Sequence, residues 1–584
     1  MVSGTILLLF LLPGQAVWPH TAAATTYYVS TTGDDDNTGT TKTAPWKSIT
    51  KVNTVSSDFR PGDRVLFKRG DTWHETLRLS CTGNKAKPII VGAYGNKDKP
   101  LPVFDGTCNS VISWQQVGPN LYKSTTPLWK QDPGLLIYDG VPYPATTTLK
   151  FTSDSPVNSI HPGAILLQVQ GRYANFWVTS VNAAERKISG ITFFRDPTYY
   201  WQSSTRVEVR QEKNGEEEKF YLTIGSPDGL QGDPKSLTKD GQWYWDAIQH
   251  SVYLYSKTDP SDHIIEIGQL KSGIKIIGQR YLRIKNISIR GFTETGIHLI
   301  NCRNIVVKNL HISAIGSNNA KVGILLQGSD HCNVTGNRVE SVLVNGISLY
   351  IASYNRIIHN KILHAGAAGI TLSRDDSSQK ADGNLFKNNI IKHSNVFTYD
   401  SGGIYFFMAG AGNVIRGNRV RNGGSRELQS SGIMVDIGSL PVTITKNTVE
   451  NNSMGGIVLT GTGHTVTKNR IRYNGFGYWQ SAQIILFPVT GNVSDCTIHS
   501  NTVAAANGQK LFLVINALPH PDDIPNDIDR NTYQATDSET FCWTDGWTCS
   551  PWLDFATWRT RTGQDLHSTF RIKPIIQPHV TRQK

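Results

Sequence analysis

The sequence lacks the long apolar runs and the compositional bias that define several large classes of protein. Its one long apolar run, at residues 6–12, is too short to span a bilayer, so a transmembrane anchor is not expected. With 38% hydrophobic and 18% charged residues, the composition also excludes collagen, a coiled coil and a disordered tail. The 584 residues are therefore expected to form a globular protein, either as several domains or as one long solenoid.

Cysteine is scarce as well, and no C-x-x-C motif occurs, so the seven cysteines do not resemble metal ligands. Cys496 has no obvious partner, and the connectivity cannot be deduced from the sequence. Three pairs are the candidates for bridging: Cys542 with Cys549, Cys81 with Cys108, and Cys302 with Cys332. The last two occupy similar places in successive repeats, so they could instead stack as small apolar side chains.

Residues 1–24 look like a secretory signal peptide, because the apolar run is followed by Ala22-Ala23-Ala24, a small-residue cleavage site. No Lys or Arg precedes the apolar run, so a buried N-terminal strand is the alternative. We expect the protein to be secreted, to the extracellular space or the periplasm.

A short motif, Gly-Ile followed by alternating residues, is repeated along the second half of the chain. Seven copies recur at intervals of 23 to 34 residues, and they begin at Gly296, Gly323, Gly346, Gly369, Gly403, Gly432 and Gly456. Between them lies a second apolar run with an asparagine, at Asn337, Asn360, Asn418, Asn447 and Asn469. Self-similarity at this period is typical of a solenoid.

The residue types in the repeat select one kind of solenoid. Leucine-rich repeats have a similar period but need an L-x-x-L-x-L framework and a helix, and no helical stripe appears here. Glycine and β-branched residues dominate, and many of the runs alternate. We predict an all-β parallel β-helix, with coils stacked about 4.8 Å apart. The recurrent asparagine is expected to form a ladder that satisfies turn backbone.

The repeat also predicts which side chains face outward. Residues one and three after each glycine are apolar and should point inward, so those two and four after it point outward. The outward residues mix hydroxyls, aromatic rings and one acid, which suits a saccharide-binding groove. The alternative is that a loop packs over this face and accounts for its apolar members. The side chains expected to line the groove are Tyr350, Arg374, Tyr405 and Phe407.

The regions outside the repeat suggest a division of the mature chain into four parts. Residues 25–108 are interpreted as an N-terminal cap and the first coils, since an open solenoid end exposes an unpaired edge. The repeat disappears over 109–270, where we expect a β-rich insertion packed against the helix. The β-helix proper is assigned to 271–530. An aromatic-rich C-terminal cap is assigned to 531–584, marked by Trp543, Trp547, Trp552 and Trp558.

Several of these stretches resemble those of secreted right-handed parallel β-helix proteins of the pectate-lyase-like superfamily. The stretches are Tyr27-Tyr-Val-Ser with Gly62-Asp-Arg-Val-Leu-Phe67 and Gly70-Asp-Thr-Trp73, Gly241-Gln-Trp-Tyr-Trp-Asp246 through Tyr255, Asp400-Ser-Gly-Gly-Ile-Tyr405, Asp436-Ile-Gly-Ser439, and Trp558 through Asp565. The resemblance covers nearly the whole mature chain and implies a right-handed β-helix. It is specific for the fold and less so for the reaction, because this superfamily includes hydrolases, lyases, epimerases and adhesin-type proteins.

The two aspartate motifs are most similar to those of β-helix glycoside hydrolases, which implies that Asp400 and Asp436 are the catalytic pair. Two positions depart from the usual motifs: Ser401 follows the first aspartate, and Ile437 stands where the second motif has a glutamate.

Hydrolysis of a glycosidic bond needs two carboxyl groups across it, one as acid and the other as nucleophile or base. In flat register Asp400 and Asp436 would lie about seven residues apart along the strand direction, so the chain must bend near Gly402-Gly403 for them to cooperate. The other candidate acids are Asp375, Asp376 and Glu427.

A lyase or uronate C5-epimerase acting on an acidic glycan is the rival hypothesis. The net charge of +12 favours an acidic polymer. Such an enzyme needs Ca²⁺ or a cation to neutralise the sugar carboxylate and a base such as Tyr, Lys or Arg, and Arg374, Tyr350, Tyr405 and Lys321 are available. Against it, no outward column of the glycine motif repeats Lys or Arg. A hydrolase implies no cofactor.

A third possibility is a glycan-binding or adhesin-type protein without chemistry. Nucleic-acid binding is not expected, because the basic residues look scattered along the sequence and export would remove the partner. The expected partner is a polysaccharide or oligosaccharide, bound by a monomer.

Overall fold

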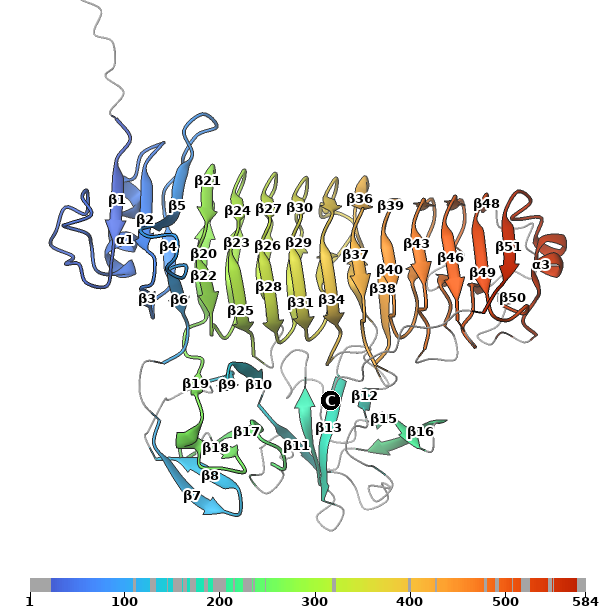
Figure 1. Cartoon of the computed structure of the whole chain (residues 1–584), viewed down its shortest axis with the longest axis horizontal. Helices are drawn as coiled ribbons and strands as arrows, with labels where there is room; N and C mark the ends of the chain where they lie inside the picture. The colour runs from blue at the N-terminus through green and yellow to red at the C-terminus, as the bar shows by residue number, and fades with distance from the viewer. Residues whose placement is uncertain are drawn as a thin grey trace, which may run out of the picture.

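The protein is an all-β, right-handed parallel β-helix, as predicted, in which three long sheets run side by side along the molecule (Figure 1). The computed structural model describes residues 23–108, 112–125, 133–143, 145–150, 160, 165–168, 175–182, 187–192, 206–213, 216–223, 234, 237–246, 248–317, 322–397, 401–425, 428–476, 481–488, 493–506, 508–515, 526–544, 549 and 551–574. Most of the predicted signal peptide lies outside these residues.

Each coil contributes one strand to each sheet. Sheet C, which contains the glycine motif, consists of β4 (Leu77–Leu79), β20 (Ser272–Ile277), β23 (Thr295–Ile300), β26 (Val322–Gln327), β29 (Asn345–Tyr350), β32 (Ile370–Ser373), β35 (Ser401–Phe407), β38 (Ser430–Val435), β41 (Ile457–Leu459), β44 (Ile484–Leu486), β47 (Phe512–Ile515) and β50 (Phe541–Thr544).

Sheet A follows sheet C in the coils from β20 onward. It consists of β1 (Thr26–Val29), β2 (Arg64–Lys68), β5 (Ile89–Tyr94), β21 (Leu282–Lys285), β24 (Val306–Lys308), β27 (Asn333–Thr335), β30 (Arg356–Ile358), β33 (Leu385–Lys387), β36 (Asn413–Arg416), β39 (Val442–Thr445), β42 (Thr465–Thr467), β45 (Thr497–His499) and β48 (Asp527–Asp529).

Sheet B completes the coil. It consists of β3 (Thr72–Trp73), β6 (Val103–Asp105), β22 (Ser288–Arg290), β25 (His311–Ile315), β28 (Arg338–Val342), β31 (Lys361–Ala365), β34 (Ile390–Ser394), β37 (Arg419–Arg421), β40 (Thr448–Glu450), β43 (Arg470–Arg472), β46 (Thr502–Ala505), β49 (Thr532–Ala535) and β51 (Thr569–Ile572).

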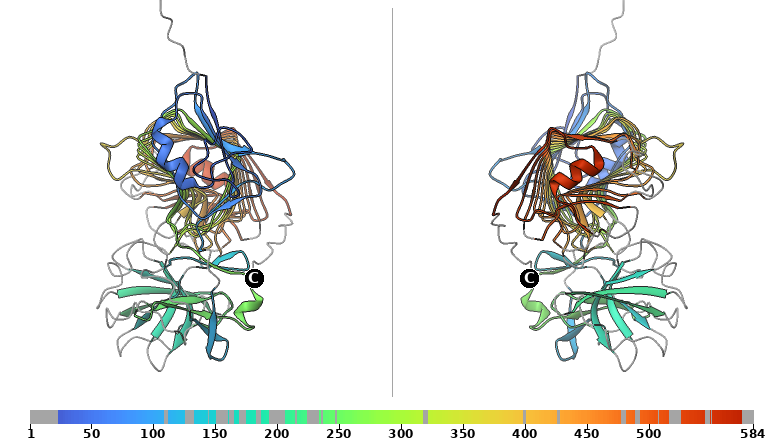
Figure 2. Two further views of the ribbon diagram at one scale, coloured as in Figure 1. Left: turned by 90° about the vertical axis from the view of Figure 1, so that its left-hand side faces the viewer. Right: turned by 90° about the vertical axis from the view of Figure 1, so that its right-hand side faces the viewer.

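Short helices lie across the two ends of the solenoid (Figure 2). At one end α1 (Ile49–Val55), continued by the 3-10 helix η1 (Ser56–Asp58), buries Ile49 and Val52. At the other end α3 (Phe555–Thr562) buries Trp558. Both helices place apolar side chains in the central core, so they cover the core at the open ends.

A β-rich segment leaves the solenoid after β6 and returns before β20, and it lies beneath the coils in Figure 1. Its strands are β7 (Trp114–Gly118), β8 (Leu121–Ser124), β9 (Leu136–Tyr138), β10 (Val141–Tyr143), β11 (Thr147–Lys150), β12 (Ile165–Gln168), β13 (Asn175–Asn182), β14 (Lys187–Thr192), β15 (Arg206–Lys213), β16 (Glu216–Thr223), β17 (Trp243–Asp246), β18 (Ser251–Tyr255) and β19 (Ile265–Ile267), with the 3-10 helix η5 (Pro260–Asp262). Leu135 and Ile137 form an apolar cluster with Ala314 and Leu343 of the coils, so this segment is packed against the helix.

The glycine of the repeated Gly-Ile motif in sheet C is required by close packing between the sheets. A Cβ atom added to Gly346 would lie 2.6 Å from the carbonyl oxygen of Gly369 in the next coil and 2.6 Å from Cγ2 of Ile362 in sheet B. Gly296 and Gly323 meet equivalent neighbours at 2.6 to 2.7 Å. The glycine lets sheet C approach the branched side chains of sheet B. Because each of these coils makes the same contact, glycine recurs at this position of the sequence repeat.

Gly346→Ala is therefore expected to destabilise the fold by about 1–3 kcal/mol, because the new methyl group has no space in a packed core. Thermal or denaturant unfolding measures this loss. The matched control is Gly118→Ala, where the added Cβ would meet Leu121 at an ordinary 3.5 Å. Equal stability of the two variants would contradict the packing explanation.

Asparagine ladders join successive coils, as the sequence predicts. In the main ladder Asn360 donates its backbone N–H to Oδ1 of Asn389 at 2.9 Å, and its Nδ2 donates to the same oxygen and to the carbonyl of Val334. The members of this ladder are Asn337, Asn360, Asn389, Asn418, Asn447, Asn469, Asn501 and Asn531. Two shorter ladders, not predicted, connect Asn355, Asn384 and Asn413, and Asn452, Asn474 and Gln483.

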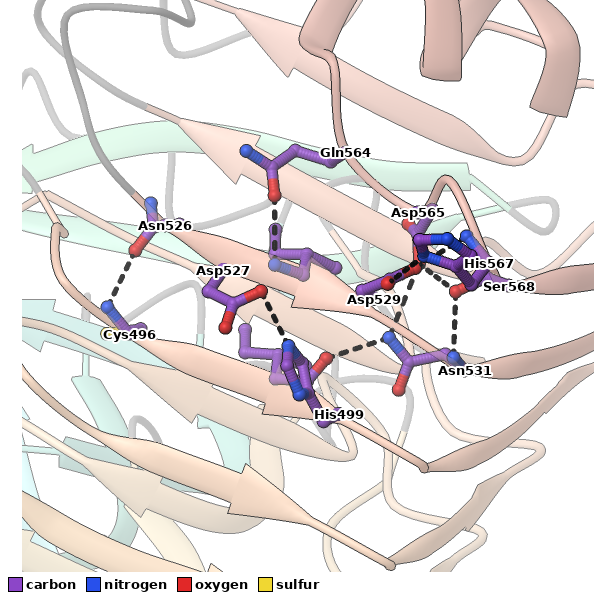
Figure 3. A network of polar contacts seen from close by, with 12 residues as sticks. Cys496, His499, Asn526, Asp527, Asp529, Asn531, Gln564, Asp565, His567 and Ser568 are labelled. Carbon is purple, nitrogen blue, oxygen red and sulfur yellow. Dashed lines mark hydrogen bonds and ion pairs between the residues drawn. The ribbon is translucent and has the colours of Figure 1, made fainter.

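The main ladder ends in the C-terminal cap, at Asp565 (Figure 3). The backbone N–H of Asn531 donates to the Ser568 hydroxyl at 2.7 Å, and Nδ2 of Asn531 points to Asp565 Oδ1 at 3.3 Å. Asp565 also accepts from Trp558 Nε1 at 2.9 Å and from the Ser568 hydroxyl at 2.6 Å. The Tyr533 hydroxyl, 3.1 Å away, completes the set. Ser568 therefore stands where the next asparagine would, since Thr532 pairs with Thr569, and the buried side chain of Asp565 beside it closes the ladder.

One of the three cysteine pairs that the sequence offers as candidates is a disulfide. Cys542 and Cys549 form a disulfide, and the other five cysteines are not disulfide-bonded. Cys302 and Cys332 do not stack, because they stand at different positions of the coil. Arg303 pairs with Asp330, which puts Cys302 level with Ser329, three residues before Cys332.

Candidate functional site

The outward face of sheet C has the alternation that the sequence predicts. In β29 the inward residues Ile347 and Leu349 are completely buried in the core, while Tyr350 is half-buried at the surface. The parallel register aligns Tyr350 with Ser373, and Ser373 with Phe407. Equivalent side chains of successive coils therefore form an outward row that leads to Asp436, the next member after Phe407.

This face is open over only part of its length. The outward residues from Ile300 to Phe407, four after each glycine, are half-buried, whereas Asp436 and Thr460 are buried. In the neighbouring outward row Met434, Val458, Ile485 and Leu513 belong to an apolar cluster of buried residues. The expectation of one long open groove is thus wrong from β38 onward, where the apolar outward side chains are covered as the alternative interpretation proposed.

Asp436 lies at the boundary between the open and the covered parts. It follows β38 directly and is 7% exposed. Its Oδ2 accepts a hydrogen bond from the Tyr405 hydroxyl at 2.8 Å, and its Oδ1 accepts the backbone N–H of Ile437 at 2.8 Å. Tyr405 comes from the preceding coil, and the side chain of Phe407 in that coil is half-buried. The carboxylate is therefore held in place on a rigid sheet next to aromatic rings.

A second tyrosine–aspartate pair has the same geometry. The Tyr350 hydroxyl donates a hydrogen bond to Oδ2 of Asp375. In both pairs the aspartate lies in the next coil, two residues beyond the residue aligned with the tyrosine. Asp375 is bound toward Tyr350, on the side of its coil away from Asp436. The structure therefore does not bring these two carboxylates into direct contact.

The other residues of the Asp375 turn are engaged within that turn. Arg374 is 5% exposed, and its guanidinium donates to the carbonyl of Gln379 at 2.7 Å and to that of Ser377 at 3.3 Å. Asp376 is exposed and accepts from the hydroxyl and the N–H of Ser378, which lowers the pKa of Asp376. The side chains of Arg374 and Asp376 are thus held within the turn, and their hydrogen bonds do not involve the outward row of sheet C.

Asp400, Glu427 and Lys321, which the sequence also marked, lie outside the described residues. The strand that follows Asp400 is informative nevertheless. β35 runs without interruption from Ser401 to Phe407, and Ser401 and Gly402 pair with Ser430 and Ser431 of β38. The register omits Gly403 and resumes with Ile404 paired to Ile433, and a Cβ added to Gly402 would lie 3.0 Å from the carbonyl oxygen of Ile404, so the backbone is not fully extended at the two glycines. The approach of Asp400 to Asp436 stays a prediction.

Sequence reasoning missed two polar pairs on this face. The Thr371 hydroxyl donates to the Ser348 hydroxyl at 2.8 Å, and His298 Nε2 lies 3.0 Å from Gln327 Oε1. All four side chains occupy the outward positions of the glycine motif, so the register alone would have shown that they are neighbours.

The described residues show neither a metal cluster nor a membrane span. No group of three or more His, Cys, Asp or Glu side chains in these ranges is arranged to hold a metal ion. Within the same ranges, no helix has the length and apolar character that crossing a bilayer requires.

Two family models match parts of the chain. Residues 322–503 match the model described as "Right handed beta helix region", which confirms the resemblance to right-handed parallel β-helix proteins. Residues 235–401 match "Periplasmic copper-binding protein (NosD)". Since no suitable cluster of metal ligands occurs among the described residues, we derive no metal chemistry from that name.

A curated relative and several solved structures are similar to the chain. Lacto-N-biosidase of Bifidobacterium longum subsp. longum is 39% identical over 149 residues, which are 24% of this chain and 9% of that enzyme. The chain thus spans a small part of this relative's length. A structure called "Glycoside hydrolase" is 13% identical, with a TM-score of 0.47, over 93% of this chain and 99% of that one. The GH136 lacto-N-biosidase from Eubacterium ramulus is 14% identical, with a TM-score of 0.41, over 94% and 68%.

Proposed function

We propose that the protein is a carbohydrate-active enzyme that hydrolyses a glycosidic bond of an oligosaccharide or polysaccharide on the outward face of sheet C. The observation that carries the proposal is a buried, hydrogen-bonded carboxylate, Asp436, on the same face as the half-buried rings of Tyr350, Tyr405 and Phe407. Rings stack on sugar faces, and a carboxyl group supplies the chemistry.

In this proposal Asp436 and Asp400 act as the two carboxyl groups, one as proton donor and the other as nucleophile or base. Tyr405 positions Asp436 through its hydrogen bond, and Tyr350 and Phe407 bind sugar rings. Asp375, held by Tyr350, is an alternative partner at the neighbouring subsite. The sequence similarity to a lacto-N-biosidase supports a carbohydrate substrate.

The structure offers less support for a lyase or an epimerase. Such an enzyme needs a cation beside the sugar carboxylate. Arg374, the arginine expected to serve there, donates instead to the carbonyls of its own turn.

We also propose that the protein is exported. The apolar run with a small-residue cleavage site at residues 1–24 supports this, and so does the disulfide between Cys542 and Cys549, since disulfides persist in oxidising compartments.

A panel of neutral and acidic glycans tests the reaction type. We expect new reducing ends without the ultraviolet absorbance of an unsaturated uronate. Reducing ends accompanied by that absorbance would identify a lyase and overturn the proposal. Binding to a glycan without any product would indicate a glycan-binding protein.

A further inference from the structure

Sheet B presents a row of basic side chains on a face of the helix other than the candidate site. We define the basic stripe as Lys361, Lys392, Arg419, Lys446, Lys468 and Arg470. These residues lie on five consecutive coils, in β31, β34, β37 and β43 and in the turns that carry the main asparagine ladder. The coils follow one another along the long axis in Figure 1, so the stripe runs lengthwise.

The parallel register places the stripe residues next to one another. In one outward row of sheet B, Lys361 aligns with Ile390, Ile390 with Arg419, and Arg419 with Thr448, which aligns with Arg470. Lys446 and Lys468 occupy equivalent left-handed positions directly before two ladder asparagines, with φ of 58° in both. The backbone therefore fixes the spacing of the cations along the row.

The positive charge of the stripe is only partly compensated. The second outward row of sheet B in these coils consists of Leu363, Lys392, Arg421, Glu450 and Arg472. Glu450 contacts Arg419, Arg421 and Arg472. Burial alone would raise the pKa of Glu450, but hydrogen bonds and charge from Arg472 and Arg419 outweigh it and lower the pKa, so Glu450 is ionised. One carboxylate thus serves three arginines.

The remaining cations have no acidic partner in the part of the chain that the structure describes. Lys361, Lys446, Lys468 and Arg470 are exposed and form no ion pair there. Desolvation lowers the pKa of Lys392, and the positive charges of Arg421, Lys361 and Arg419 lower it further. The charges of these three neighbours therefore act against the protonated form of Lys392 in addition to its desolvation.

We propose that the basic stripe binds a linear polyuronate, an unbranched polysaccharide with one carboxylate per sugar. Strands in a parallel sheet recur about every 4.8 Å, and the cations Lys361, Arg419 and Arg470 stand on every second coil of their row, about 10 Å apart. This spacing is comparable with the length of two sugar residues, so these cations can meet alternate carboxylates of the polymer. Each exposed ion pair contributes little, and the row gains affinity by engaging many of them at once.

Other polyanions fit the stripe less well. Single-stranded nucleic acid is held by aromatic side chains between the cations, and the two outward rows from Lys361 to Arg472 contain none. The rings that directly follow the second row are already engaged, since His364 stacks on His393 and Arg472 lies over Tyr473. A membrane surface calls for apolar side chains that insert beside the cations, and Ile390 is the large exposed apolar residue of these rows. The stripe is therefore assigned to a glycan, independently of the reaction at sheet C.

The test is the affinity of the whole protein for polygalacturonate, measured by calorimetry at low and at physiological salt. The variant Lys361→Gln/Lys446→Gln/Lys468→Gln/Arg470→Gln removes four exposed cations that make no ion pair with any residue the structure describes. We expect it to bind about 10-fold or more weakly, because several small contributions are lost together, while the thermal midpoint stays unchanged. The affinity of the unmodified protein should fall as salt rises.

The control variant Lys42→Gln/Lys85→Gln/Lys97→Gln/Lys257→Gln removes the same number of exposed positive charges elsewhere on the protein. It should bind like the unmodified protein. An equal loss in both variants would mean that only net charge matters, and it would overturn the site. Tighter binding of a single-stranded oligonucleotide or of anionic vesicles through the same residues would overturn the choice of partner. Because the readout is binding, failure here leaves the hydrolase proposal untouched.

Discussion

Asp436→Asn is expected to lower the rate of glycan hydrolysis by about 10²-fold or more, because the variant keeps the shape of the side chain but cannot exchange a proton or attack a sugar. The amide oxygen can still accept the hydrogen bond from Tyr405, so the fold around β38 should be preserved. The rate is measured as reducing ends released from a substrate identified in the glycan panel, alongside a thermal midpoint. Asp400→Asn is expected to have an effect of similar size.

Asp376→Asn is the matched control for the removal of a carboxylate. Asp376 is exposed and bound to Ser378 within its own turn, so its loss should leave the rate close to normal. A near-normal rate in Asp436→Asn and Asp400→Asn would remove the proposed site. If Asp376→Asn lost activity instead, the reacting groups would lie at the Asp375 turn.

Asp565→Ala is expected to destabilise the terminal coils by about 3–5 kcal/mol, because it leaves several buried donors without an acceptor. Trp558 Nε1 and the Tyr533 hydroxyl would lose this acceptor, and both residues are buried. A solenoid is stabilised by contacts between neighbouring coils, so the effect should be local. Amide hydrogen exchange near β48, β49 and β51 should speed up, with little change in the first coils.

The loss of stability caused by Asp565→Ala should also depend on pH. Burial raises the pKa of Asp565, and this outweighs the hydrogen bonds from Ser568, Trp558, Asn531 and Tyr533, which lower it. The folded protein therefore keeps this proton to a higher pH than the unfolded chain does. The stabilisation that belongs to the protonated form is present below the ordinary pKa and is lost as the pH rises through the raised value. The deficit of Asp565→Ala should accordingly shrink with rising pH.

Asp527→Ala is the control at the same end of the molecule. Asp527 is largely exposed, and its contact is with His499 at 2.6 Å. Exposed pairs of this kind contribute at most about 1 kcal/mol, so exchange in the terminal coils should change little. Equal effects of Asp527→Ala and Asp565→Ala would contradict the role of Asp565 as the end of the ladder.

The coil could be predicted from the sequence because its constraints recur at fixed positions. Gly346 is required because a Cβ atom there would lie 2.6 Å from the carbonyl oxygen of Gly369 in the next coil. Since the same requirement recurs in successive coils, it leaves a periodic pattern that a single sequence shows. The asparagine ladder is visible for the same reason. The register also follows from the pattern, and it places Tyr405 beside Met434 and therefore near Asp436.

The extent of the open face and the basic stripe could not be predicted in the same way. They depend on which surfaces other segments cover and on the register of sheet B, and the period of the repeat does not contain that information. Val458 and Leu325 occupy the same outward position of the motif, yet Val458 is buried and Leu325 is not. The basic residues look scattered along the sequence because the glycine motif aligns only the outward rows of sheet C. Aligning the second run of each repeat would have placed Lys361, Arg419 and Arg470 in one row.

The asparagine ladder gives the molecule a direction along which it can lengthen. Every rung accepts from the coil before it and donates to the coil after it, so an inserted duplicate of one whole coil would restore all hydrogen bonds by itself. A fragment of a coil would leave two rungs mismatched. Variation in length among such proteins should therefore come in whole coils, each with its own asparagine, placed ahead of the aspartate that closes the series.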